Sequence, residues 1–192
     1  MKKSNDKYQK LRAQWWDYSS NAEYFITICT MKKAPFFGEV LDQKMILNEL
    51  GLWAKSCWYD IPSHFPFVDL GAFIVMPDHI HGILKINKPH ICKMQVESQN
   101  IATPHSYQEN ILNNTEKNKF GPQSKNLASV IRGYKIGVTK KAKSLNPSFK
   151  WQTLYYDHII RNETDLKRII KYIEENPIKW DKKKKENPRK YY

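Results

Sequence analysis

VMPDHIHGIL, residues Val75–Leu84, places two histidines one residue apart at the start of an apolar run. In a β-strand, successive side chains point to opposite faces of the sheet. His79 and His81 therefore project together from one face, while the opposite face of the strand enters the core with Ile80, Leu84 and Ile86. Two neighbouring imidazoles on a rigid strand form half of a site for a divalent metal ion. The alternative is a pair of polar residues on a solvated face.

The composition favours a protein that binds a polyanion. The chain has 192 residues, 41% of them hydrophobic, and a formal net charge of +13. This length suits one domain, or one domain with an insertion. The charge exceeds the magnitude of about 2–8 that solubility requires in a small domain. Nucleic acid is therefore the expected partner, with simple solubility as the alternative.

Other features argue against a membrane or a disulfide framework. No apolar run reaches the roughly 18 residues of a membrane span, and the N-terminus lacks the apolar region of a signal peptide. The run Lys182–Lys185 has no apolar face that could bind a membrane surface. The cysteines, Cys29, Cys57 and Cys92, are far apart without CxxC spacing. We expect a cytoplasmic, nucleoid-associated protein with free thiols.

The pattern of apolar residues predicts an α+β fold. Strands are expected at 23–30, 68–75 and 79–86, with a further strand across 149–152 and 154–160. Helices are expected over about 43–58, from about 124 onward, and from Arg161 to Asn176–Pro177. They define one domain at 21–180, with a basic arm before it (1–20), a polar insertion within it (87–122) and a basic tail after it (181–192).

The helix that begins near Ser124 has a basic face. Its apolar stripe has helical spacing and comprises Leu127, Val130, Ile131, Tyr134 and Val138. Its other face carries Arg132, Lys135, Lys140 and Lys141. These four side chains are candidates for contact with DNA phosphates, and ordinary solvation is the alternative.

The last predicted helix carries two polar side chains one turn apart. Asn162 can cap it, with Asp165 three residues later, and its apolar stripe comprises Leu166, Ile169, Ile170 and Ile173. Tyr172 and Asn176 are four residues apart on one flank of this stripe, so they are neighbours. If that flank faces the histidine pair, one site holds two imidazoles, an amide oxygen and a phenol.

Such a site suits phosphodiester chemistry. Imidazole, amide oxygen and phosphate oxygens are ligands for Mg²⁺ or Mn²⁺, and the ion would polarise the phosphate. Attack by the Tyr172 phenol would leave a covalent phosphotyrosine that conserves the energy of the broken bond. The alternative is that Tyr172 is an amphipathic residue at the edge of the core.

Several segments together resemble one family. Met76–Gly82 resembles the histidine–hydrophobe–histidine (HUH) motif of single-strand transposases with one catalytic tyrosine. Three later segments resemble the signature of the branch called REP-associated tyrosine transposases: Trp151–Gln152, Tyr156–Arg161 and Tyr172–Pro177. Phe25–Thr30 resembles the first strand of the same branch. The resemblance covers roughly residues 8–86 and 124–180, and the segment 87–122 departs from the compact form of the family.

The resemblance implies an antiparallel sheet of about four or five strands flanked by helices, of the ferredoxin-like type. It implies that His79 and His81 bind the metal and that Tyr172 is the nucleophile. Asn176 would be the third ligand, with Asp78 or His158 as substitutes and Gln152 as a remoter candidate. His158 and Arg161 would support the site or bind phosphate, or they form a buried hydrogen-bonded pair.

The function expected is that of a metal-dependent DNA transposase. It would cleave and rejoin single-stranded DNA, beside a hairpin, as a monomer or a homodimer. One alternative is a DNA-binding protein of the same fold that has lost catalysis, and another is a replication or mobilisation nickase. A zinc hydrolase fits least, because no third strong ligand lies at close spacing.

Overall fold

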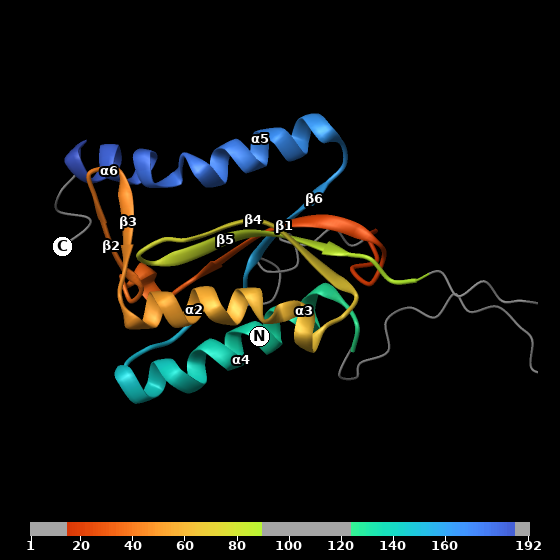
Figure 1. Cartoon of the computed structure of the whole chain (residues 1–192), viewed down its shortest axis with the longest axis horizontal. Helices are drawn as coiled ribbons and strands as arrows, with labels where there is room; N and C mark the ends of the chain where they lie inside the picture. Colours follow the sequence, from red (N-terminus) through yellow and green to blue (C-terminus); the bar gives the residue numbers. More distant parts are fainter. Residues whose placement is uncertain (1–14, 90–123, 187–192) are drawn as a thin grey trace, which may run out of the picture.

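A four-stranded antiparallel sheet forms the middle layer of the computed structural model, which describes residues 15–89 and 124–186 (Figure 1). The strands lie in the order β4-β5-β1-β6. Their bounds are β1, Ala22–Cys29; β4, Val68–Val75; β5, His79–Ile86; and β6, Tyr156–Ile160. The expected α+β fold with an antiparallel sheet is therefore confirmed, and β4 and β5 have the predicted bounds.

Helices cover both faces of this sheet. On one face lie α2 (Glu49–Tyr59), α3 (Ile61–His64) and α4 (Leu127–Leu145). On the other face lie α5 (Glu163–Glu174) and α6 (Asn176–Glu186), as Figure 1 shows. None of the helices in residues 15–89 and 124–186 is long and apolar enough to cross a membrane.

The alternation of β5 divides the core between the two faces. Ile80, Leu84 and Ile86 are at most 1% exposed and pack in the larger cluster, with Trp58 of α2 and Tyr134 of α4. This placement confirms the predicted apolar face of the strand. The odd-numbered side chains point to α5, where a second cluster contains Phe25, Ile83, Ile160, Ile169 and Ile173. The histidines are on this second face.

The first predicted helix, 43–58, is wrong over its first third. Residues Gly38–Leu41 (β2) and Lys44–Leu47 (β3) form an antiparallel hairpin. Its two-residue turn has φ 46° at Asp42 and 63° at Gln43, as a tight hairpin turn requires. Helix α2 begins only after Asn48, whose side chain accepts a hydrogen bond from Gly51 N at 2.9 Å.

The C-terminal segment also differs from the prediction. Helix α5 ends at Glu174, but α6 begins at Asn176, with Pro177 in its first turn, where proline is tolerated. Residues 181–186 of the predicted tail are therefore helical, and residues 187–192 lie outside the described residues. Trp151 forms only an isolated bridge with Thr30, and the strand that follows begins at Tyr156. Most of the predicted arm and insertion, 1–14 and 90–123, lie outside the described residues.

Candidate active site

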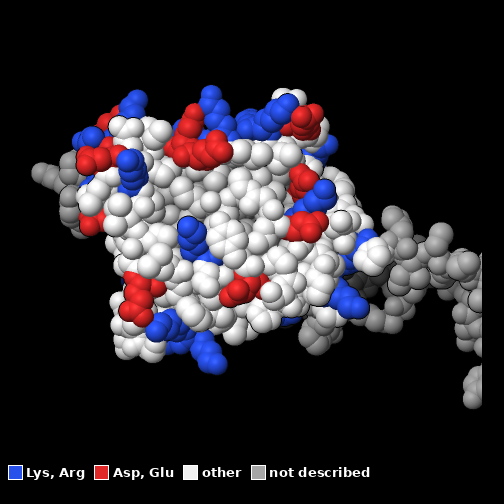
Figure 2. All heavy atoms as spheres, in the orientation of Figure 1, with Lys and Arg blue, Asp and Glu red and all other residues white. Residues whose placement is uncertain are grey.

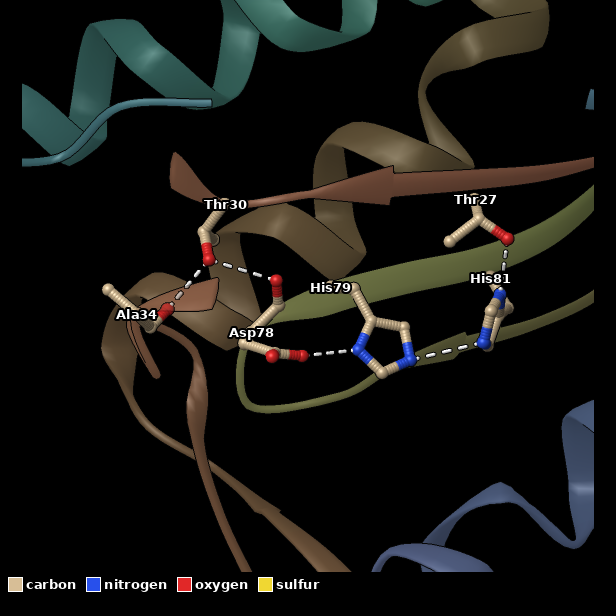
Figure 3. Close-up of polar contacts among 6 residues, drawn as sticks. All are labelled: Thr27, Thr30, Ala34, Asp78, His79 and His81. Carbon is tan, nitrogen blue, oxygen red and sulfur yellow. Dashed lines mark hydrogen bonds and ion pairs between the residues drawn. The ribbon is translucent and has the colours of Figure 1, made fainter. Parts of the chain in front are cut away.

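The two histidines of β5 turn their Nε2 atoms toward each other. The Nε2 atoms of His79 and His81 are 3.0 Å apart, as Figure 3 shows. His81 is 4% exposed, and the side chain of His79 is 14% exposed. Two converging nitrogens, one on a buried ring and one on a largely buried ring, exclude the interpretation of two polar residues on a solvated face.

The other nitrogen of each ring is held by a neighbouring side chain. Asp78 Oδ1 contacts His79 Nδ1, and Thr27 Oγ1 lies 2.8 Å from His81 Nδ1 (Figure 3). Thr27 is directly opposite His81 in the register of β1 and β5. Partners of this kind fix the orientation and tautomer of metal-binding histidines. The two rings are thus set in place before any ligand arrives.

The turn before β5 is tied to the end of β1. The backbone oxygen of Asp78 accepts hydrogen bonds from the backbone N–H and the hydroxyl of Thr30, both at 2.9 Å. Thr30 is fully buried, and its hydroxyl also contacts Ala34 O at 2.7 Å. These contacts position the Asp78 carboxylate beside His79.

Burial keeps the inner histidine neutral. Loss of solvation, together with the neighbouring His79, lowers the pKa of His81 from 6.5 to about 3. His81 is therefore uncharged near pH 7. The neutral imidazole is the form that binds metal ions.

Tyr172 lies beside the histidine pair within the same chain. Its ring centroid is 5.2 Å from that of His81 and 5.9 Å from that of Phe25. The side chain projects from α5 and is 40% exposed, so its hydroxyl can reach a bound molecule. The expectation that the phenol lies near the imidazoles is confirmed, and its role as nucleophile stays a prediction.

A cavity of about 1080 Å³ joins these side chains. It is bordered by the end of β1 and the loop after it, by the start of β5, and by the facing sides of α5 and α6. Its lining includes five predicted site residues, Asp78, His79, His81, Tyr172 and Asn176. The remaining lining residues are Phe25, Thr27, Cys29, Lys32, Lys33, Ala34, Pro35, Tyr156, Lys179, Trp180 and Lys183.

The donor atoms in this cavity fit a small divalent cation. Two ligands in adjacent octahedral positions, each about 2.1 Å from the ion, lie about 3.0 Å apart, which matches the two Nε2 atoms. Among residues 15–89 and 124–186 there is no cluster of three His, Cys, Asp or Glu side chains that could hold a metal. Asn176, which is 6% exposed, also lines this cavity, and its side chain carries an amide oxygen that suits such an ion.

Two further groups near the pair are less suited to binding a metal. Burial, together with the charge of Asp78, raises the pKa of the Cys29 thiol. This thiol stays protonated at neutral pH, and the thiolate is the form that binds metals. Asp78 contacts the Nδ1 side of His79, away from the converging Nε2 atoms, which suits a supporting role.

The structure places the remaining predicted support residues elsewhere. His158 Nε2 is 2.7 Å from Asp165 Oδ2, and Arg168 Nη2 is 2.5 Å from Asp165 Oδ1. Both hydrogen bonds lower the pKa of Asp165, and the one from Arg168 has the larger effect. Asp165 is seven residues before Tyr172, about 10 Å along a helix. His158 therefore contacts the start of α5 and lies outside the residues that line the cavity.

Arg161 and Gln152 likewise lie outside the residues that line the cavity. The Arg161 guanidinium is 5.5 Å from the ring centroid of Trp15. The backbone N–H of Gln152 donates to Cys29 O at 2.9 Å, and its backbone oxygen accepts from Lys135 Nζ at 2.6 Å. Gln152 thus ties the 149–155 segment to the end of β1.

Helix α4, which carries the predicted basic side chains, is on the other side of the sheet from α5 and α6 (Figure 1). Arg132, Lys135 and Lys140 line a separate cleft of about 680 Å³. Lys135 Nζ is bound to the backbone oxygens of Gln152 and Thr153, and Lys141 Nζ pairs with Glu49 at 3.1 Å. A DNA strand bound in the cavity would therefore be on the opposite side of the sheet from the basic side chains of α4.

Several cavity residues were missed in the sequence. Thr27 pairs with His81 across 54 residues, so only the strand register brings them together. Lys179, Trp180 and Lys183 follow Asn176 at helical spacing, a signal obscured by the lysine run 182–185. Lys32 and Lys33 come directly after the first strand, at the end of β1 nearest the histidines.

Two proteins of Haemophilus influenzae are similar in sequence to this chain. A scan against protein-family models found no matching family. The chain is 37% identical over 174 residues to an uncharacterized protein of Haemophilus influenzae, with 90% of this chain and 89% of that protein covered. A second protein of H. influenzae, named "Putative REP-associated tyrosine transposase", is 24% identical over 163 residues, with 85% of this chain and 74% of that protein covered.

A solved structure shares the fold. It is a REP-associated tyrosine transposase bound to a REP hairpin, with a TM-score of 0.54 and 16% identity, covering 88% of this chain and 74% of that one. The four-stranded sheet and its flanking helices thus define a transposase-like fold. By its identity and coverage, the chain belongs to the same protein family as the uncharacterized H. influenzae protein.

Proposed function

We propose that this protein is a metal-dependent DNA transposase that cleaves and rejoins single-stranded DNA through a 5′-phosphotyrosine. The observation that carries the proposal is the position of the Tyr172 ring, 5.2 Å from the His81 ring in a cavity that also contains His79 and Asn176. Similarity to proteins named REP-associated tyrosine transposases supports the same class of activity.

The histidine pair and Asn176 would hold Mg²⁺ or Mn²⁺. The ion would supply Lewis-acid stabilisation of the charge that develops on the phosphate. Asp78 and Thr27 fix the two rings, so both Nε2 atoms stay directed at one point. Burial keeps His81 neutral and therefore able to bind.

Tyr172 would perform the strand transfer. Its hydroxyl oxygen attacks the scissile phosphorus, and the bond from phosphorus to the 3′ oxygen breaks. The phenol proton is transferred, by way of water, to the leaving 3′ oxygen. In the second step, the 3′ hydroxyl of another DNA end attacks the phosphotyrosine, and the phenol is restored. No net hydrolysis occurs, so the strands are rejoined without another energy source.

The substrate we propose is single-stranded DNA next to a hairpin. The structural relative was solved with a REP hairpin, and the net charge of +13 favours a polyanion. A protein acting on such DNA would work in the cytoplasm, in contact with the nucleoid.

A cleavage assay tests this function. The parent protein and Tyr172→Phe are incubated with a labelled single strand that carries a hairpin, with Mn²⁺, and the products are separated on a denaturing protein gel. We expect a covalent protein–DNA adduct for the parent and none for Tyr172→Phe. Equal cutting by the two proteins would rule out the proposed nucleophile, and metal-independent binding without any adduct would indicate a DNA-binding protein that lacks catalysis.

A further inference from the structure

One face of α6 borders the cavity along two turns of the helix. Asn176, Lys179, Trp180 and Lys183 all line it, at positions i, i+3, i+4 and i+7. At 3.6 residues per turn they lie within an arc of about 100°. We call these four residues the α6 ridge. The ridge therefore continues from the expected metal ligand toward the outside of the site.

The ridge is held in place by the other side of α6. Pro177 and Asp181 are buried, and Lys185 Nζ is 2.7 Å from Asp181 Oδ2. Helix α6 also contacts β2 and β3, the hairpin that lies beside it in Figure 1. This packing sets which face of α6 borders the cavity. A binding surface on it would be largely preformed.

The chemistry of the ridge fits a nucleotide. The Trp180 ring centroid is 5.8 Å from that of His79, so an aromatic surface lies next to the metal site. Lys179 Nζ is 5.1 Å from the Tyr172 ring centroid and 3.0 Å from Glu175 Oε2, and Lys183 is one turn further along. Figure 2 shows Lys and Arg side chains, interspersed with Asp and Glu, along the edge of the molecule formed by α5 and α6.

Two more lysines reach the cavity from a strained turn. Lys32 and Lys33, in the 3-10 turn η1 (Met31–Lys33), have φ values of 57° and 56°. Consecutive non-glycine residues in this region are uncommon, and such strain is concentrated at ligand sites. The backbone bond from Met31 N to Lys150 O, 2.7 Å, holds the turn. The strained turn therefore adds two cations to the cavity that already holds the ridge.

We propose that the α6 ridge binds the single-stranded DNA next to the scissile phosphate. Trp180 stacks on an unpaired base, and Lys183 contacts a neighbouring phosphate, with Lys32 and Lys33 contacting the strand from η1. Stacking on an aromatic ring requires a base that is free of its pair. The ridge thus selects single strands over duplex at this position. This inference rests on the proposed function, because it names the substrate contacts of the same site.

Binding without catalysis tests the ridge separately from the chemistry. Tyr172→Phe is used as the background, in EDTA, and a fluorescent single strand of about 12 nucleotides is titrated by anisotropy. Adding Trp180→Ala should weaken binding about tenfold, while Trp180→Phe should retain most of the affinity because a ring remains. A duplex of the same sequence should bind more weakly and respond little to Trp180→Ala.

The lysine contact has a matched control. Lys182 and Lys183 are adjacent and exposed, but only Lys183 lines the cavity. Lys183→Ala should reduce the slope of log affinity against log salt by about 0.7, the value for one phosphate of a single strand. Lys182→Ala should leave the slope unchanged. Thermal unfolding of each variant shows whether it is folded, and the exposed Lys183 gives a test even if Trp180→Ala unfolds.

Three results would overturn the proposal: equal slopes for the two lysine variants, unchanged affinity for folded Trp180→Ala, or tighter binding of the duplex. None of these measurements needs the metal or the nucleophile. A protein that binds as expected but never forms an adduct would therefore contradict the proposed function and leave the ridge supported.

Discussion

Thr27→Val should weaken metal binding although it removes only one hydroxyl group. Thr27 Oγ1 is 2.8 Å from Nδ1 of His81, a side chain that is 4% exposed. Valine has nearly the same shape, so the substitution leaves packing in place and removes the hydrogen bond. The hydroxyl both donates and accepts, which valine cannot do.

Both capacities of the hydroxyl are used. When Nδ1 of a neutral His79 donates a hydrogen bond to Asp78, the Nε2 atom of the same ring has a free lone pair. With that lone pair, His79 accepts a hydrogen bond from His81 Nε2 in the 3.0 Å contact, and Thr27 then donates to His81 Nδ1. If both Nε2 atoms bound a metal, the His81 proton would be on Nδ1, and the Thr27 hydroxyl would accept a hydrogen bond from it.

The expected loss of metal affinity follows from removing the hydrogen-bond partner of the buried His81 Nδ1. An unsatisfied buried nitrogen costs about 1–3 kcal/mol, and loss of a residue that orients a metal ligand lowers affinity by about 10- to 100-fold. We expect Thr27→Val to weaken Mn²⁺ binding by that factor, measured by calorimetry or by the electron paramagnetic resonance signal of free Mn²⁺. Thr27→Ser keeps the hydroxyl and should bind within about threefold of the parent. Equal Mn²⁺ affinity for Thr27→Val and the parent would refute this reasoning.

Four further outcomes are expected. Gly82→Ala should lower the free energy of unfolding by about 1–3 kcal/mol or more in urea, because the added Cβ would be 2.2 Å from Trp58 Cζ2. An unchanged urea midpoint would contradict this and show that the core can rearrange around the methyl group. Asn176→Ala should lower Mn²⁺ affinity more than Asn176→Asp does, since aspartate keeps an oxygen ligand, and equal losses in a titration would remove Asn176 from the metal site. Burial raises the pKa of the Cys57 thiol to about 11, so peptide mapping should find little alkylation of Cys57 at pH 8 and an increase toward pH 11; rapid labelling at pH 8 would contradict it. In EDTA, the free energy of unfolding should fall by about 2 kcal/mol from His81 alone as the pH drops from 7 to 5. The reason is that the unfolded histidine (pKa 6.5) binds a proton in this range and the folded one (pKa about 3) does not. A His81→Gln variant with the same pH dependence in urea unfolding would argue against this contribution.

The parts of the fold that were predicted correctly are those with a local signal. The alternation of β5 and the turn at Met76–Asp78 place the histidines on one face without any long-range information. The stripe with Ile169 and Ile173 likewise predicts which side of α5 is buried. The position of Tyr172 beside that stripe then follows from helical geometry and the family resemblance.

The parts that were missed depend on contacts between distant segments. Ile46 and Leu47 fit both a strand and a helix, and the turn at Asp42–Gln43 contains no glycine to mark it, so the hairpin β2–β3 was merged into a helix. Helix α6 has no apolar stripe; it is stabilised through buried Asp181 and contact with the hairpin. The helical spacing of the α6 ridge was therefore hidden by the lysine run 182–185 and had no apolar stripe to support it.

The identity of the covalent bond tests the central claim most directly. The reaction of the parent protein with a hairpin-bearing single strand and Mn²⁺ is quenched, digested with nuclease and protease, and analysed by mass spectrometry. The account predicts a nucleotide joined through its 5′ phosphate to the peptide that contains Tyr172. A nucleotide joined to any other residue, or strands cut with no protein attached, would contradict it.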